Sequence, residues 1–324
     1  MVPIDFGTGR LGDEIPAWLS VQPMKRRFYG LDLYFREGWE DLAAAGPAEV
    51  VRGWLDRHTV LLCKPDAVVG RELETVFEWL ARHDARVVAA EITSGGRHVI
   101  RALWEFQWNI ATRDRRDVTE LFMERTPMLL LVVRMPAGAL PASVRMAGLK
   151  GSANATDRAP HQLRSSLTTT NYILNGVHSP DEPADVVREL SVLLDERQRR
   201  RVIQAIRTGS EESPRAKAER LYAQTPGEPA LDLVSRRSRW LEAIGSAGRD
   251  GVVHADEDAR LRGLLADVES GRRDWRDFVT AMEDAGIPWD AWDTVVLGTA
   301  LADAHVPDRL RILPGASPAE WSRG

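Results

Sequence analysis

The sequence predicts an α/β protein of the α+β kind, in which a segment of strands and helices is followed by an all-helical region. Between residues 58 and 208, apolar runs of strand length alternate with amphipathic helical patterns. Residues 218–324 show helical patterns only. The chain has 324 residues, of which 44% are hydrophobic and 28% are charged, so it is globular in composition and too long for one ordinary core.

An N-terminal extension that is mostly helical is expected over residues 1–57. Its early prolines and glycines predict irregular structure. The stretch from Gly38 to Arg57 then carries an apolar stripe, which predicts one or two short helices interrupted near Gly46-Pro47.

Four strands are expected between residues 58 and 208. They are predicted at residues 58–63, 86–93, 128–135 and 171–177. The third is almost wholly apolar, which indicates a central position in a sheet. The first strand ends at Lys64-Pro65, because proline closes a strand. The side chain of Cys63 points to the strand face opposite that of Lys64, so we assign Cys63 to the core.

Helices are expected between and after these strands, at residues 71–83, 99–108, 117–124, 143–149 and 183–206. The last of them is read as one long helix with a basic end. Residues 150–164 are polar and predict a loop. This order is typical of a ferredoxin-like βαββαβ sheet with its helices on one side.

Residues 209–217 read as a linker, and four helical patterns follow at residues 231–244, 256–268, 275–285 and 289–304. We therefore divide the chain into an extension (1–57), an α/β domain (58–208) and a helical C-terminal domain (209–324).

Composition and charge argue against several classes of protein. The net charge of −5 gives no basic field that would attract nucleic acid or an acidic membrane. The single cysteine cannot form an intramolecular disulfide, which fits a reducing compartment. No apolar run is long enough to cross a membrane, and the N-terminus lacks the pattern of a signal peptide. We expect a cytoplasmic protein with neither nucleic acid nor membrane as a partner.

Three short segments contain the residues that indicate chemistry. The first is Lys64-Pro65-Asp66, the second is the loop that runs through Thr156 to Arg164, and the third is Asn175-Gly176-Val177-His178 with Glu189 eleven residues beyond the histidine. Each segment alone is weak evidence for a functional site, because a lone lysine or histidine at a strand end is more often a surface residue. Together, in this order, they resemble the nucleoside diphosphate kinase family.

The resemblance covers residues 58–190 and implies a phosphotransferase. His178 would take the γ-phosphoryl group of a nucleoside triphosphate as a phosphohistidine and pass it to a nucleoside diphosphate or a related phosphorylated acceptor. Glu189 would orient the imidazole ring, and Lys64 would hold the phosphate oxygens.

The resemblance also implies a set of nucleotide-binding residues. Arg145 and Arg164 would join Lys64 on the phosphates, and Thr156 would donate a hydrogen bond to one of them. Asn175 would hold the ribose 3′-hydroxyl, and Tyr172 would offer the base a stacking face. Mg²⁺ would bridge the phosphates of the donor, which is ATP or another nucleoside triphosphate, and no side chain is assigned to the metal.

The sequence departs from the family's pattern at three points. Ser179-Pro180 replaces the Gly-Ser that follows the family's histidine, the polar loop is about three residues short, and the family's base-stacking aromatic ring has no counterpart. The alternative function is therefore a catalytically degenerate nucleotide-binding sensor or scaffold. For the assembly we favour a homodimer, although the extensions alter the surfaces through which the family assembles.

Overall fold

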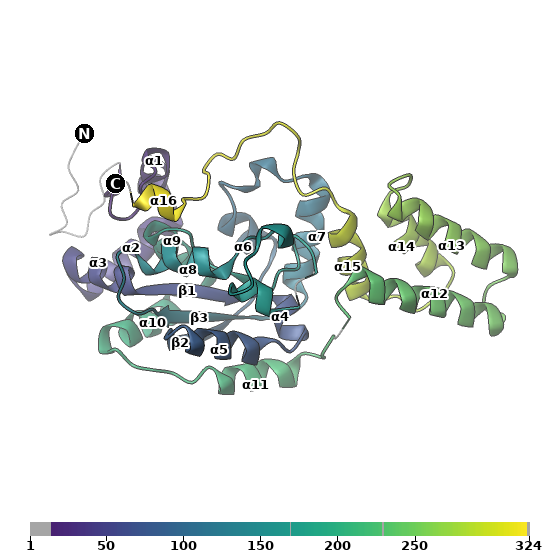
Figure 1. Ribbon diagram of the computed structural model, residues 1–324, viewed down its shortest axis with the longest axis horizontal. Coiled ribbons are helices and arrows are strands. Elements are labelled where there is room, and N and C mark those ends of the chain that lie inside the picture. Colours follow the sequence, from purple (N-terminus) through teal and green to yellow (C-terminus); the bar gives the residue numbers. More distant parts are fainter. Residues whose placement is uncertain (1–13, 169, 229, 323–324) are drawn as a thin grey trace.

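The computed structural model describes residues 14–168, 170–228 and 230–322. Its centre is a sheet, with the N-terminal helices at one end and a helical lobe at the other (Figure 1). The extension contains α1 (Pro23–Leu31), α2 (Leu33–Ala45) and α3 (Ala48–Arg57). The predicted interruption at Gly46-Pro47 is confirmed as the break between α2 and α3.

The sheet is antiparallel and has the strand order β2-β3-β1-β4, which confirms the ferredoxin-like prediction. Its strands are β1 (His58–Cys63), β2 (Arg86–Thr93), β3 (Met128–Arg134) and β4 (Val177–His178). As predicted, β3 is an inner strand.

Helices cover both faces of the sheet, so the expectation of helices on one side is wrong. Cys63 and Leu131 face one core with α5 (Leu73–Arg82) and α11 (Arg215–Gln224). Leu62 and Val132 face the other core with α2 and α9 (Pro183–Leu193). The reason is the unbroken burial of β1, because a strand that is apolar on both sides needs cover on both sides.

The fourth strand is much shorter than the predicted residues 171–177. The Asn171 side chain accepts hydrogen bonds from the backbone N–H groups of Ile173 and Leu174, both at 2.9 Å, which makes a turn of this segment. Gly176 has φ +76°, a left-handed conformation that a strand cannot contain. Only Val177 and His178 pair with β1.

The predicted long helix over residues 183–206 is two helices, α9 and α10 (Glu196–Thr208). Leu194 is extended, and the Asp195 side chain caps α10 by accepting from the backbone N–H of Gln198 at 2.7 Å. Arg199 therefore lies near the start of α10, where it pairs with Asp41 of α2.

The remaining helices of the α/β part are α4 (Pro65–Val69), α6 (Arg97–Leu103), α7 (Arg113–Glu124) and α8 (Ala142–Lys150), with 3₁₀ turns at η1 (Trp108–Ile110), η2 (Ala155–Asp157) and η3 (Leu163–Ser166). The helical lobe consists of α12 (Leu233–Arg249), α13 (Ala255–Glu269), α14 (Trp275–Asp284) and α15 (Ala291–Leu301). Among the described residues, no helix has the length and apolarity that a membrane crossing requires.

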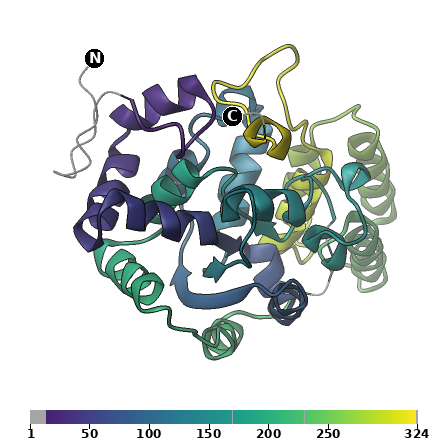
Figure 2. The ribbon, with the colours of Figure 1, turned by 60° about the vertical axis from the view of Figure 1, so that its left-hand side comes forward.

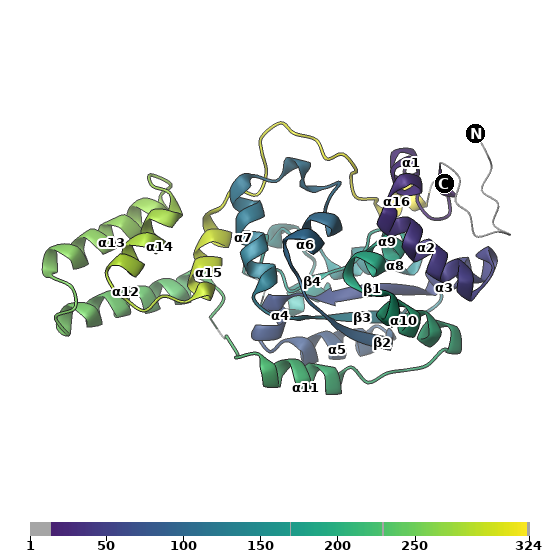
Figure 3. The same cartoon turned by 180° about the vertical axis from the view of Figure 1, so that it is seen from behind.

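The first and last described helices both lie against the α/β part. In the extension, the Lys25 ammonium is buried and pairs with Glu182 at 2.6 Å and with Asp185 at 2.9 Å. At the other end, α15 packs against α7, and the following segment runs back over the molecule (Figures 1 and 3). It ends in α16 (Pro318–Trp321), beside the N-terminal helices (Figure 2).

Candidate functional site

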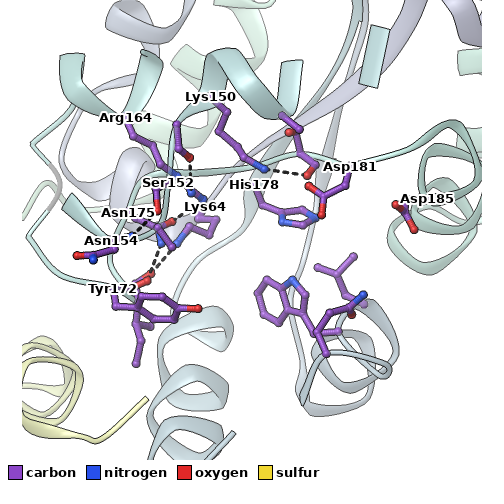
Figure 4. A pocket seen from close by; sticks show the side chains of 18 of the residues that line it. Lys64, Lys150, Ser152, Asn154, Arg164, Tyr172, Asn175, His178, Asp181 and Asp185 are labelled. Atoms are coloured by element: carbon purple, nitrogen blue, oxygen red, sulfur yellow. Dashed lines mark hydrogen bonds between the residues drawn. The ribbon is translucent and has the colours of Figure 1, made fainter. Parts of the chain in front are cut away.

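A cavity of about 690 Å³ opens at the end of the sheet where β1 ends and β4 begins. Its walls come from α6, η1, α7, α8, the polar loop after α8, and α9. Figure 4 shows the labelled side chains around this space, among them Lys64, Arg164 and His178. The Lys64 and His178 motifs are more than one hundred residues apart in the sequence, and the antiparallel pairing of β1 with β4 brings them together.

The His178 ring is fixed by Glu189. Its Nε2 lies 2.9 Å from the Glu189 Oε2, and the edge of its ring meets Trp104 with 5.7 Å between ring centroids. Among the described residues, Nδ1 has no hydrogen-bond partner. Nδ1 is therefore the nitrogen that remains available for reaction.

Burial keeps this imidazole neutral. It lowers the pKa of His178 to about 3, and the nearby cations Lys150, Arg164 and Lys64 act in the same direction. A neutral imidazole nitrogen is a competent nucleophile at pH 7. Burial, together with the neighbouring carboxylates of Asp185 and Asp181, also raises the pKa of Glu189 well above its usual value.

Lys64 lies at the junction of β1 and α4, where the following proline occupies the first turn of the short helix. Its buried ammonium donates to the Ile173 carbonyl at 2.7 Å and lies 3.9 Å from the Asp66 carboxylate. Burial lowers the pKa of Lys64 to about 8. The contact of Lys64 with the Ile173 carbonyl also holds the segment of residues 171–176 away from the sheet.

Arg164 and Asn175 form one hydrogen-bonded unit. The Arg164 guanidinium donates to the carbonyls of Gly151 at 2.9 Å and Val177 at 2.6 Å, and to Asn175 Oδ1 at 3.1 Å. Burial lowers the pKa of Arg164 to about 10. The Asn175 amide donates to the Tyr172 carbonyl at 2.6 Å, which ties the polar loop to the segment before β4.

The structure does not bring two of the predicted residues to the cavity. Thr156 is exposed on η2, where its hydroxyl donates to Asp157 Oδ1 at 3.1 Å. Arg145 points from α8 toward the preceding loop and donates to the Leu140 carbonyl at 2.9 Å. Lys64, Arg164, Tyr172, Asn175, His178 and Glu189 all line the cavity.

Lys150 is a site residue that the sequence prediction missed. Its buried ammonium donates to the Ser179 carbonyl at 3.0 Å, next to His178, and burial lowers its pKa to about 8. The feature that could have indicated Lys150 is its position as the last residue of α8, directly before the polar loop. Asp181, from the turn before α9, lines the same part of the cavity.

Three further basic side chains line the cavity near Tyr172, namely Arg115 of α7 and His305 and Arg311 of the C-terminal segment. Nothing local in the sequence marks them, because the last two lie more than 130 residues from the motif that they approach.

Comparisons with known proteins found a family profile and solved structures that match part of this chain. The profile of the family described as nucleoside diphosphate kinase matches residues 57–199. The chain is similar to the solved nucleoside diphosphate kinase of Aquifex aeolicus, at 17% identity and a TM-score of 0.37, over 44% of this chain and 97% of that one. It is similar to the Halobacterium salinarum enzyme in complex with CDP at 22% identity and a TM-score of 0.37, over 44% and 90% of the two chains. No curated protein matches the chain.

Proposed function

We propose, from the premise that residues 57–199 form a nucleoside diphosphate kinase domain, that this chain is a phosphotransferase which works through a phosphohistidine at His178. One observation carries the proposal. The His178 ring is held through Nε2 by Glu189, while Nδ1 has no hydrogen-bond partner among the described residues and the ring lies in a cavity lined by cations. This arrangement suits an attack on phosphorus.

In the proposed first step, the Nδ1 lone pair attacks the γ-phosphorus of a nucleoside triphosphate. The N–P bond forms as the bond from phosphorus to the bridging oxygen breaks, and the diphosphate leaves with that electron pair. The ring gains positive charge, which the Glu189 carboxylate offsets through the Nε2 proton. In the second step, a phosphate oxygen of the acceptor attacks the phosphorus of the phosphohistidine. The new O–P bond forms as the N–P bond breaks, and the electron pair of that bond returns to Nδ1, which restores the neutral ring.

Three cations would neutralise the transferring group. An ammonium has three donors, and Lys64 and Lys150 each use one on a backbone carbonyl, so two remain for phosphate oxygens. Arg164 adds a buried guanidinium. These groups are already oriented by their backbone contacts, and such preorganised charge is usually a large part of catalysis.

Mg²⁺ would enter with the triphosphate of ATP or another donor. Among the described residues, no three His, Cys, Asp or Glu side chains cluster as metal ligands. The side chains that line the cavity fit an ion that phosphate oxygens hold. Asp181 of the cavity wall would be an outer partner of this ion, and the metal would neutralise the phosphate charge.

The acceptor would be a nucleoside diphosphate or a related phosphorylated compound. Asn175 keeps one amide N–H beyond its bond to Tyr172 and would hold the ribose hydroxyl. The aromatic ring of Tyr172 faces the cavity.

A nucleotide-binding sensor or scaffold without turnover is the second candidate, and the raised pKa of Glu189 favours it. A protonated Glu189 would donate to Nε2, place the ring proton on Nδ1 and block the nucleophile. In addition, the buried Ser179 hydroxyl has no hydrogen-bond partner among the described residues, so it does not support Glu189.

Incubation with γ-labelled ATP and Mg²⁺ separates the two functions. Phosphotransfer predicts acid-labile, base-stable label in the wild type and no label in His178→Ala. His161→Ala is the matched control and should be labelled like the wild type, because the His161 side chain is exposed and lies outside the cavity. ATP binding by calorimetry without label would establish the sensor, and equal label in His178→Ala would refute the phosphohistidine.

A further inference from the structure

The segment after α15, here called the C-terminal strap (residues 302–316), closes one side of the cavity. The backbone N–H of Val306 donates to the Ile110 carbonyl at 2.7 Å, and that of Leu313 donates to the Phe106 carbonyl at 3.2 Å. Between them, the Asn109 amide donates to the Leu310 carbonyl at 2.8 Å. The strap is therefore attached along the segment that joins α6 to α7 (Figure 3).

The strap places His305 and Arg311 in the cavity wall beside Arg115 and Tyr172. The Arg115 guanidinium lies 5.0 Å from the centroid of the Tyr172 ring and donates to the Ala304 carbonyl of the strap at 3.1 Å. The rings of Tyr172 and His305 meet edge to face at 5.3 Å. Figure 4 shows Tyr172 on the side of the cavity away from Lys150.

In the part of the chain that the structure describes, this cluster of basic side chains has no counter-charge. Among the described residues, neither Arg115 nor Arg311 has a carboxylate oxygen within the 4.0 Å of an ion pair. By contrast Arg276, which faces the same helix α7, pairs with Asp114 at 2.9 Å. Asp157 also lines the cavity, but its carboxylate accepts from the side chains of its own loop.

The charges also act on one another. Burial lowers the pKa of His305, and Arg115 and Arg311 lower it further. Like charges held together without a carboxylate raise the free energy of the unliganded protein, and an anion that binds there lowers it. Arginine is the side chain best suited to hold a phosphate or a carboxylate, through two parallel hydrogen bonds.

We infer that Arg115, His305 and Arg311 form a second anion subsite, which binds a phosphate group that the substrate carries in addition to its reacting phosphates. The inference deepens the proposed function and rests on it for the nucleotide that fills the rest of the cavity. It gives the strap a role in specificity, since the strap supplies two of the three basic side chains, His305 and Arg311. The substrate class is then a nucleotide or acceptor with a further phosphate distant from the one that reacts.

Binding measurements on the full chain test the subsite. ADP is compared with ADP that carries an additional 3′-phosphate, by calorimetry, in the wild type and in Arg311→Gln. We expect at least about tenfold tighter binding of the 3′-phosphorylated nucleotide, and the loss of most of that preference in Arg311→Gln while the affinity for ADP stays within twofold. Arg309→Gln is the matched control, because Arg309 lies on the same strap and does not line the cavity.

A second arm identifies the source of the phosphate. Inorganic phosphate is titrated into protein saturated with ADP. Binding that Arg311→Gln abolishes, without a preference for the 3′-phosphorylated nucleotide, assigns the subsite to a phosphate of a different molecule. The inference is overturned if neither arm shows binding that depends on Arg311. Label on His178 reports the proposed function separately, so normal labelling without Arg311-dependent binding in either arm refutes only the subsite, and Arg311-dependent binding without labelling refutes only phosphotransfer.

Discussion

The proton between His178 and Glu189 decides whether the imidazole can react. With the carboxylate ionised, Nε2 donates to Glu189 and the Nδ1 lone pair faces the cavity. With Glu189 protonated, the direction of that bond reverses and Nδ1 carries the proton. Bound phosphates and Mg²⁺ would alter the charge around both groups, so we predict that the reactive form is selected in the complex with substrate.

Replacing Glu189 with glutamine tests this dependence. Glu189→Gln keeps the size of the side chain and removes the charge that offsets the phosphorylated ring. We expect the rate of phosphohistidine formation to fall by a factor on the order of 10² to 10³. Single-turnover labelling at pH 7.5 measures it, with the exposed Glu196→Gln as the control. A rate within threefold of the wild type would show that the carboxylate is not needed.

Lys64 and Lys150 should make the proposed nucleotide binding dependent on pH. Both have a pKa of about 8. Above that pH they lose the charge that attracts phosphate, so we expect the affinity for ADP to fall between pH 7 and pH 9.5. Lys150→Met removes one titrating group at similar volume, and its affinity should be lower at pH 7 and change less with pH. Calorimetry at the two pH values measures both effects.

The same lysines give the unliganded protein the opposite trend. A lysine has a pKa of 10.5 when unfolded and about 8 at these two positions when folded, so between these values the unfolded chain binds more protons. The free energy of unfolding should therefore rise with pH from about 8 toward 10.5 as far as these two groups determine it. A steeper fall in the wild type than in Lys150→Met over that range would contradict the assignment.

At the scale of elements, the segment before β4 shows what the sequence could and could not predict. Its apolar residues correctly indicated a position beside the sheet. Its conformation depends on side chains instead, since Asn171 bonds to the backbone beyond it and Lys64 takes the Ile173 carbonyl. Local apolar patterns in the sequence do not reveal such long-range contacts. The motif residues were found because their three segments together resemble one family, and Lys150 was missed because no second residue nearby indicated it.

The packing of α2 on α9 links the extension to the site. A Cβ on Gly38 would lie 2.4 Å from the Val187 carbonyl oxygen, which belongs to the helix that carries Glu189. We expect Gly38→Ala to shift α2 or α9 and to destabilise the protein by about 1–3 kcal/mol. Because Glu189 moves with α9, phosphohistidine formation should also slow, although Gly38 does not line the cavity.

Gly53→Ala is the matched control for this prediction. Gly53 lies in helix α3, and a Cβ there meets no atom within 4 Å. Alanine at that position should leave labelling unchanged and stabilise the helix by up to about 1 kcal/mol. Chemical denaturation and single-turnover labelling measure both variants, and equal behaviour of the two would refute the role of the α2–α9 contact.

At the scale of the whole molecule, the cavity is assembled from all three parts of the chain. The extension supplies Tyr29, the α/β part supplies the motif residues, and the strap supplies His305 and Arg311. The sequence predicted the helices of both extensions but not their contribution to the site, because pairing across more than 100 residues leaves no local pattern. The boundaries at 57/58 and 208/209 and the homodimer stay predictions. Helix α11, which follows the second boundary, packs on the sheet.

The helical lobe depends on one close contact for its position. Gly298 of α15 faces Val118 of α7, and a Cβ there would lie 2.6 Å from the Val118 side chain and 3.2 Å from the ring of Trp275. Gly298→Ala must separate α15 from α7, with an expected loss of about 1–3 kcal/mol of the free energy of unfolding. Because the strap continues from α15 and Arg115 lies on α7, the same change should weaken any anion binding that depends on Arg311.

Gly263→Ala of α13, where a Cβ meets open space, should instead stabilise the lobe by up to about 1 kcal/mol and leave binding unchanged. Denaturant unfolding together with hydrogen exchange of the α7 amides distinguishes the two variants, since only separation of α15 from α7 accelerates exchange in α7. If both variants exchange alike, the lobe is held by contacts other than the one at Gly298.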